Sequence, residues 1–251
     1  SLLREECPQL VIHAAAWTDV ERAEREPDSA YRVNALGARN VAAACARAGA
    51  RMILISTDYV FDGTRVGPYV ESDVPRPLSA YGRGKLEGEL LARRELPDLT
   101  VVRTAWLYGA GGQSFLTRIL RAARGRDVLG VVEDETGSPT WSAELSRILA
   151  EMAVRGPTGP LYHAVSTGSC SRYELAVELF RLLGIEKTQL RSVKAASFPS
   201  QVRRPANSAL ASECLDRDGF TPLRPWKMAL ADFVKLNSEM LLNVYRGMHD
   251  K

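Results

Sequence analysis

The sequence has no long apolar run and almost no excess of one charge. No apolar run reaches the roughly 18 residues that a membrane-spanning helix needs, so we expect no membrane partner. The formal net charge of +3 is too small to argue for a nucleic-acid partner. The first residues do not have the pattern of a secretory signal peptide. The composition is therefore that of an ordinary globular protein.

Cysteine is also scarce. The four cysteines, Cys7, Cys45, Cys170 and Cys214, are far apart in the chain. No Cys-x-x-Cys pair and no Cys/His spacing typical of metal ligands occurs, so we expect no metal site. Scattered cysteines of this kind indicate reduced thiols, and we expect a cytoplasmic protein.

A glycine-rich phosphate-binding turn is missing before Leu10. The glycine clusters at 82–84 and 109–112 come far too late for such a turn. A dinucleotide-binding fold opens with a strand, a glycine-rich turn and a helix that receives the pyrophosphate. If the chain has this fold, at least one βαβ unit of about 30 residues is missing. We expect that this unit precedes the given sequence, rather than that the protein is a natural remnant.

A candidate proton donor follows a predicted strand. The apolar residues 53–55 lead into Ser56 and Thr57, and Tyr81 and Lys85 stand four residues apart at the start of a predicted helix. Side chains with this spacing share one helix face, where an ammonium lowers the pKa of a nearby phenol. The pair could then donate a proton near neutral pH, with the Thr57 hydroxyl in the same place. Alone, the pattern also fits a solvated tyrosine and lysine on a helix.

The wider pattern resembles the extended short-chain dehydrogenase/reductases. The segment Ser56–Gly63 reads STDYVFDG, which is the pattern of the dTDP-4-dehydrorhamnose reductases without a gap. Residues 137–140 resemble the Gly-x-Pro-Thr element of that family, and residues 203–208 resemble its RRPxNS pattern. Glu135 stands where the family usually has glutamine. The resemblance covers essentially the whole chain.

The resemblance implies roles for the candidate residues and NADPH or NADH as the cofactor. Tyr81 would donate the proton, Lys85 would lower the tyrosine pKa and bind the nicotinamide ribose, and Thr57 would hydrogen-bond the reacting oxygen. The implied cofactor contacts are Ala14, Ala15, Ala16, Thr18, Asn34, Ser56, Tyr81 and Lys85. The resemblance also makes Asn34 a candidate support for the active-site strand. Without the resemblance, the alanines equally fit a close helix–strand contact, and Asn34 equally fits a plain helix-face asparagine.

Five further residues are candidate contacts of a sugar nucleotide. Asp58 and Tyr59 could hydrogen-bond sugar hydroxyls, and Trp106 at a strand end could stack on a sugar face. Arg203 and Arg204 fit a diphosphate, because guanidinium groups bind such oxygens in pairs. The plain alternatives are a turn-forming aspartate, packed aromatic residues and a solvated basic turn.

A single helix is expected before the central strand. Asp28 or Ser29 would be its N-cap, and the helix would run to about Ala48 and stop at Gly49.

The fold class that we expect is α/β, a doubly wound, Rossmann-like parallel sheet with a smaller C-terminal substrate-binding lobe. Residues 1–109 would form the dinucleotide-binding domain, residues 142–165 would return to it, and residues 110–251 would mainly form the lobe.

The helix that carries Tyr81 is thinned for close packing by Gly82, Gly84 and Gly88. Because short-chain reductases often associate through this helix, we expect a homodimer.

The implied activity is NAD(P)H-dependent reduction of the C4 ketone of a dTDP-4-keto-6-deoxyhexose, a step of dTDP-L-rhamnose biosynthesis. A reductase or epimerase of another nucleotide sugar is one alternative. A non-enzymatic regulatory subunit of the methionine adenosyltransferase type is another. The intact set of Thr57, Tyr81 and Lys85 favours an enzyme over that second alternative.

Overall fold

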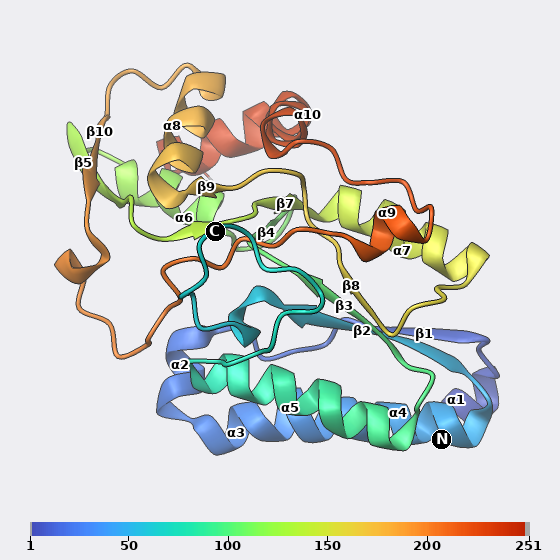
Figure 1. Ribbon diagram of the computed structural model, residues 1–251. Coiled ribbons are helices and arrows are strands. Elements are labelled where there is room, and N and C mark those ends of the chain that lie inside the picture. The colour runs from blue at the N-terminus through green and yellow to red at the C-terminus, as the bar shows by residue number, and fades with distance from the viewer. Residues whose placement is uncertain (1, 249–251) are drawn as a thin grey trace.

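A four-stranded parallel sheet forms the centre of the computed structural model, which describes residues 2–248 (Figure 1). The strands are β1 (Leu10–His13), β2 (Arg51–Thr57), β3 (Thr100–Thr104) and β8 (Leu161–His163), and they lie in this order. Helices pack on both faces of the sheet. The α/β fold with a parallel sheet is therefore confirmed.

One face of the sheet is covered by α4 (Gly37–Ala48) and α5 (Ala80–Glu95), with α1 (Leu2–Glu6) beside α4. The small buried residues of α4 allow it to lie close to the strands and to α5. Together these elements bury one apolar cluster, which includes Ala38, Ala42, Cys45, Met52, Leu54, Ala92 and Val101.

The other face is covered by α7 (Ser142–Arg155) and by the segment that contains α9 (Cys214–Arg217). Its core includes Ile53, Val102, Ile148, Met152, Tyr162 and Phe220. Because β2 is buried on both faces, its residues 52–55 form a continuous apolar run instead of alternating with polar residues.

A second group of elements forms a lobe beside the sheet (Figure 1). The parallel pair β5 (Val128–Val132) and β10 (Gln189–Val193) packs with α6 (Phe115–Ala123), α8 (Arg172–Leu183) and α10 (Trp226–Arg246) around a separate core. Two short pairs join the lobe elements, β4 (Leu107–Tyr108) with β7 (Thr140–Trp141) and β6 (Thr136–Gly137) with β9 (Cys170–Ser171). The division near residue 109 stays a prediction, and β8 pairs with β3 of the main sheet.

The helical segment before β2 differs from the expected single α-helix. It consists of α3 (Pro27–Tyr31), a π-helical turn η1 (Arg32–Leu36) and α4. The predicted N-cap at Asp28 or Ser29 is wrong, because Pro27 is the first helical residue, as suits its fixed backbone. The predicted end is confirmed: Gly49 has a φ of 68°, the left-handed conformation typical of a helix C-terminus.

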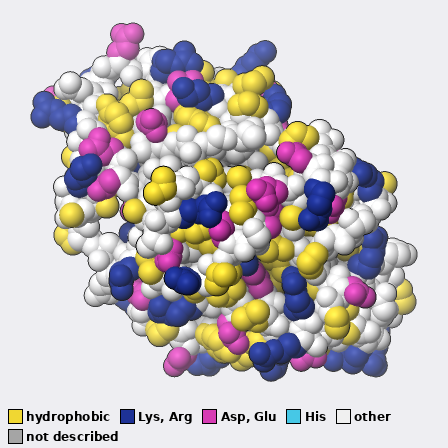
Figure 2. Space-filling view, in the orientation of Figure 1, with side chains coloured by type: hydrophobic (Ala, Val, Ile, Leu, Met, Phe, Trp, Pro, Cys, Tyr) yellow, Lys and Arg dark blue, Asp and Glu magenta, His cyan; other side chains and the backbone are white. Residues whose placement is uncertain are grey.

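Three short helical elements complete the chain, α2 (Val20–Arg25) and the 3-10 turns η2 (Asp58–Val60) and η3 (Ala195–Ser197). Within residues 2–248, no helix is both long and apolar enough to cross a bilayer. On the face shown in Figure 2, basic and acidic side chains are interspersed, so this face carries no continuous track of one charge.

Candidate active site

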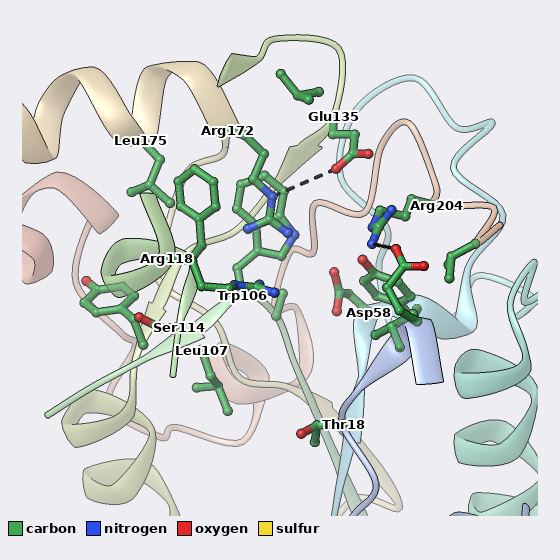
Figure 3. A pocket seen from close by; sticks show the side chains of 18 of the residues that line it. Thr18, Asp58, Trp106, Leu107, Ser114, Arg118, Glu135, Arg172, Leu175 and Arg204 are labelled. Carbon is green, nitrogen blue, oxygen red and sulfur yellow. Dashed lines mark hydrogen bonds and ion pairs between the residues drawn. The ribbon is translucent and has the colours of Figure 1, made fainter. Parts of the chain in front are cut away.

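A cavity of about 1270 Å³ lies between the carboxyl ends of β1, β2 and β3 and the lobe (Figure 3). Thr18 lines it from the loop after β1, Thr57 from the end of β2, and Trp106 from the segment after β3. Open α/β sheets bind their ligands at this edge, because the loops that follow the strands converge there. The fold therefore brings three of the predicted site segments to one place.

The start of α5 is fixed by two hydrogen bonds that involve side chains. Ser79 caps the helix by accepting from the Gly82 amide at 3.1 Å, and the Glu24 carboxylate accepts from the Ala80 amide at 2.8 Å. Tyr81 follows directly and lines the cavity. The orientation of Tyr81 is therefore set by a well-anchored first helical turn.

Thr57 and Tyr81 meet as the sequence predicted. The Thr57 hydroxyl lies close enough to the Tyr81 phenol to lower the pKa of that phenol, and it donates to Asp58 Oδ1 at 3.0 Å. The Tyr59 ring lies edge-on to Tyr81, with 5.7 Å between the ring centroids. A hydroxyl pair of this kind can hold one ligand oxygen between a proton donor and a second hydrogen-bonding group.

The predicted effect of Lys85 on Tyr81 is wrong for this structure. Burial raises the pKa of Tyr81, and the neighbouring Thr57 hydroxyl only partly opposes this rise. The Lys85 ammonium instead donates to the carbonyl oxygen of Ile55 at 2.7 Å. Burial lowers the pKa of Lys85 to about 8, and the charge of Glu89 opposes that decrease. Tyr81 is thus a neutral phenol with its proton available.

The predicted cofactor side is only partly at the cavity. Ala14, Ala16 and Thr18 line it, and their small side chains leave room for a flat ligand to approach the backbone. Ala15 is exposed and does not line the cavity, because alternate residues of this extended segment point in opposite directions.

Asn34 and Ser56 act differently from the prediction. The Asn34 side chain accepts from the Trp17 amide at 2.8 Å and donates to the Trp17 carbonyl at 3.1 Å. It therefore holds the loop before Thr18 and not the active-site strand. Ser56 borders the cavity, but its hydroxyl donates to Glu89 Oε1 at 2.5 Å and is not free for a cofactor.

Among the predicted substrate residues, Asp58, Tyr59 and Arg204 line the cavity, but Arg203 does not. Burial raises the pKa of Asp58 to about 6, against hydrogen bonds from Ser208 and Thr57. Arg204 forms an ion pair of 2.6 Å with Glu21 of α2. Arg203 is exposed, since neighbouring residues of this loop face opposite ways, and its predicted place in the pocket is wrong.

Arg172, the first residue of α8, is a cavity residue that the sequence analysis missed. Its guanidinium carbon lies 3.4 Å from the Trp106 ring centroid and 5.0 Å from the Phe115 centroid. Its Nε lies 4.0 Å from Glu135 Oε2 (Figure 3). Burial lowers the pKa of Arg172, while Tyr59, Glu135 and Asp58 oppose that decrease. Arg172 thus brings a positive charge to the centre of the cavity.

This contact changes the expected use of Trp106. The indole lies in the cavity, but the Arg172 guanidinium covers one of its faces. A Cβ at Gly137 would clash with the indole ring, so only glycine allows this placement. Trp106 itself has a φ of 44°, which is uncommon for a residue with a side chain. A sugar could therefore contact only the part of the indole that Arg172 and Gly137 leave open.

Comparison with known proteins adds a consistent set of relatives. A family model described as RmlD substrate binding domain matches residues 1–238. The chain is 43% identical to the dTDP-4-dehydrorhamnose reductase of Mycobacterium tuberculosis, over 88% of this chain and 75% of that protein. It is 39% identical to the dTDP-4-keto-6-deoxy-D-glucose reductase of Streptomyces niveus, over 92% of this chain and 81% of that protein.

A solved structure has the same fold. The dTDP-4-dehydrorhamnose reductase of Bacillus anthracis, solved in complex with NADP, aligns with a TM-score of 0.90 and 36% identity. The alignment covers 94% of this chain and 83% of that one.

Proposed function

Because the chain belongs to the dTDP-4-dehydrorhamnose reductase family, we propose that it reduces the C4 ketone of a dTDP-4-keto-6-deoxyhexose with NADPH or NADH. The product would enter dTDP-L-rhamnose biosynthesis. The observation that carries the proposal is the placement of Thr57 and Tyr81 together at the strand ends, in a cavity that also holds arginine side chains. That cavity offers a proton donor on Tyr81 and, on Arg172 and Arg204, positive charge for a diphosphate.

The residues that line the cavity fit a nicotinamide cofactor on the side of Ala14, Ala16 and Thr18. When bound there, the reduced nicotinamide supplies the hydride. Tyr81 donates its proton to the ketone oxygen as that oxygen becomes a hydroxyl. Because burial keeps the phenol neutral, the proton is transferred only to a strongly basic oxygen, such as a developing alkoxide.

Two neighbouring groups assist this proton transfer. The Thr57 hydroxyl hydrogen-bonds the same substrate oxygen and holds it in place beside the phenol. The Lys85 ammonium, held beside the strand end by its bond to the Ile55 carbonyl, binds the nicotinamide ribose.

The substrate contacts follow the lining of the cavity. Asp58 and Tyr59 position the hexose by hydrogen bonds, and the open part of Trp106 packs beside it. Arg204 and Arg172 hold the diphosphate, since both present guanidinium groups to the cavity. Arg203 is left out of this assignment because it does not line the cavity.

The test is an assay of the purified protein with NADPH or NADH and dTDP-4-keto-6-deoxyhexoses of different configuration. We expect cofactor oxidation, with the new hydroxyl identified by NMR of the product. The relative from Streptomyces niveus, named for a different 4-keto sugar, makes another dTDP-4-keto sugar the second candidate substrate. Absence of cofactor oxidation with every such substrate would contradict the proposal.

We also propose a homodimer that associates through α5, and a cytoplasmic location. The exposed apolar side chain of Leu90 on α5 supports the first, although the glycines of this helix pack inside the protomer. The four free thiols support the second. Light scattering at micromolar concentration tests the oligomeric state, and a monomer there would contradict the dimer.

A further inference from the structure

Two side chains tie α5 to strand β2, one helical turn apart. Lys85 Nζ donates to the Ile55 carbonyl at 2.7 Å, and Glu89 Oε1 accepts from the Ser56 hydroxyl at 2.5 Å. Lys85 and Glu89 follow Tyr81 by four and eight residues, so all three share one helix face. The two strand residues immediately precede Thr57. The geometry between Tyr81 and Thr57 therefore depends on how this helix face sits on β2.

Glu89 also joins the next strand. It accepts from Arg103 Nε at 3.0 Å and from Arg103 Nη2 at 2.7 Å, in a bidentate pair. Arg103 lies directly opposite Ser56 in the register of β2 and β3. Glu89, Arg103 and Ser56 are 6%, 3% and 4% exposed. One carboxylate thus fixes α5 against two adjacent strands from inside the protein.

General stability does not explain this buried pair well. Burying two charges costs about as much free energy as their attraction returns, so apolar side chains would often serve equally well. Directional hydrogen bonds do what apolar contacts cannot, because they hold only one relative position of two elements. The position of α5 must be exact, because the helix lies very close to neighbouring backbone. A Cβ at Gly82 would clash with the Tyr59 carbonyl, and a Cβ at Gly88 would clash with the Asn34 carbonyl.

We propose that Glu89 is a positioning residue of the reductase site, which holds Tyr81 against Thr57 and places a negative charge one helical turn from the Lys85 ammonium. This inference rests on the proposed function. The titratable and charged groups that face Lys85 include Glu89 on its own helix and His13 on β1, and Arg103 on β3 is paired with that Glu89. Only Glu89 opposes the burial that lowers the pKa of Lys85. Without the Glu89 charge, Lys85 would lose its proton at a lower pH.

The main test is Glu89→Gln, which keeps the shape of the side chain and removes its charge. We expect kcat to fall by about tenfold to a hundredfold, with KM for the sugar nucleotide within about threefold of wild type. The loss of activity at high pH should move to lower pH. The Lys85 titration can be followed directly by NMR of ¹³C-labelled lysine, because the chain has only six lysines and Lys85→Arg identifies the signal.

Glu144→Gln is the matched control. Glu144 is also 6% exposed and forms an ion pair of 2.6 Å with Arg224, but it lies on α7. Both glutamine variants should lose stability, whereas only Glu89→Gln should shift the Lys85 titration. Glu89→Asp keeps the charge and shortens the side chain, so it should lower kcat and leave the Lys85 titration close to that of wild type.

The proposal fails if folded Glu89→Gln has the kcat and the Lys85 titration of wild type. It also fails if kcat falls without any shift of that titration, because the role is then only structural. Should Glu89→Gln not fold, Ser56→Ala removes one bond and leaves the charge. That variant should lower kcat by about tenfold, and an unchanged kcat would overturn the positioning role. Inactive wild-type protein would overturn the proposed function alone, since the NMR titration still tests the Glu89 charge.

Discussion

The Arg172 guanidinium stacks on the Trp106 indole at 3.4 Å from the ring centroid, and its Nε faces Glu135 Oε2 at 4.0 Å. Arg172 belongs to α8 and Trp106 to the segment after β3, so their contact joins the lobe to the edge of the sheet. Stacking needs the flat guanidinium, while the ion pair needs only a charge. The two contributions can therefore be separated by substitution.

Arg172→Lys keeps the positive charge and removes the flat group. We expect KM for the sugar nucleotide to rise about tenfold while kcat stays within about threefold, because stacking and a forked donor are lost. Steady-state kinetics measures both constants. Arg181→Lys is the control on the same helix, since Arg181 is exposed and pairs with Glu178. An unchanged KM in Arg172→Lys would show that the guanidinium does not contact the substrate.

Tyr81→Phe removes the proposed proton donor and keeps the ring. We expect kcat to fall by ~10²-fold or more, with binding of NADPH unchanged, because the phenol acts only during proton transfer. Turnover assays and fluorescence titration measure the two effects. Tyr31→Phe on α3, outside the cavity, should behave as wild type. Near-wild-type turnover of Tyr81→Phe would remove this tyrosine from the mechanism.

Asp58→Asn should change how stability depends on pH. Burial raises the pKa of Asp58 to about 6, so the folded protein holds this proton more tightly than the unfolded chain does. The stability that protonation adds is complete below about pH 4 and is lost as pH rises through about 6. The asparagine side chain stays neutral at every pH. As pH rises from about 4 to above 6, the free energy of unfolding of Asp58→Asn should therefore increase relative to that of wild type by up to about 3 kcal/mol.

Urea unfolding of wild type and Asp58→Asn at about pH 4 and about pH 7 measures this difference. Asp216→Asn, at an exposed position on α9, should show no comparable change between the two pH values. If the difference in free energy of unfolding between Asp58→Asn and wild type is the same at both pH values, Asp58 is ionised throughout the range.

Gly88→Ala should destabilise the protein although alanine favours helices. A Cβ at Gly88 would clash with the Asn34 carbonyl, whereas one at Gly84 meets Asn34 Cβ at an ordinary 3.5 Å. We expect Gly88→Ala to lose about 1–3 kcal/mol through overpacking and Gly84→Ala to gain up to about 1 kcal/mol. Thermal or urea unfolding compares the pair. Equal effects of the two substitutions would contradict the close approach of α5 to η1.

Local patterns in the sequence were enough to predict much of the site. The apolar run before Thr57 predicted β2, and the four-residue spacing of Tyr81 and Lys85 predicted their common helix face. Both depend on residues that are near one another in the chain. The same holds for Gly49, which ends α4 as expected.

The remainder depends on contacts between distant segments. Arg172 reaches Trp106 only because α8 packs beside β9 and β6, and no periodicity encodes that placement. Arg203 and Arg204 occupy a loop, where alternate directions of side chains cannot be read from spacing. The role of Glu89 does have a signal in the sequence, because Arg103 interrupts the apolar β3 and a buried arginine requires an acidic partner.

Strand β8 returns to the sheet only after residues 110–160 have formed other elements, and α10 completes the core of the lobe near the end of the chain. During synthesis on the ribosome, β1, β2 and β3 emerge in their spatial order, but the fourth strand of the sheet, β8, follows much later. We expect the half-built sheet to need protection from aggregation at its open edge. The cavity, which draws on both regions, would be among the last parts of the protein to form.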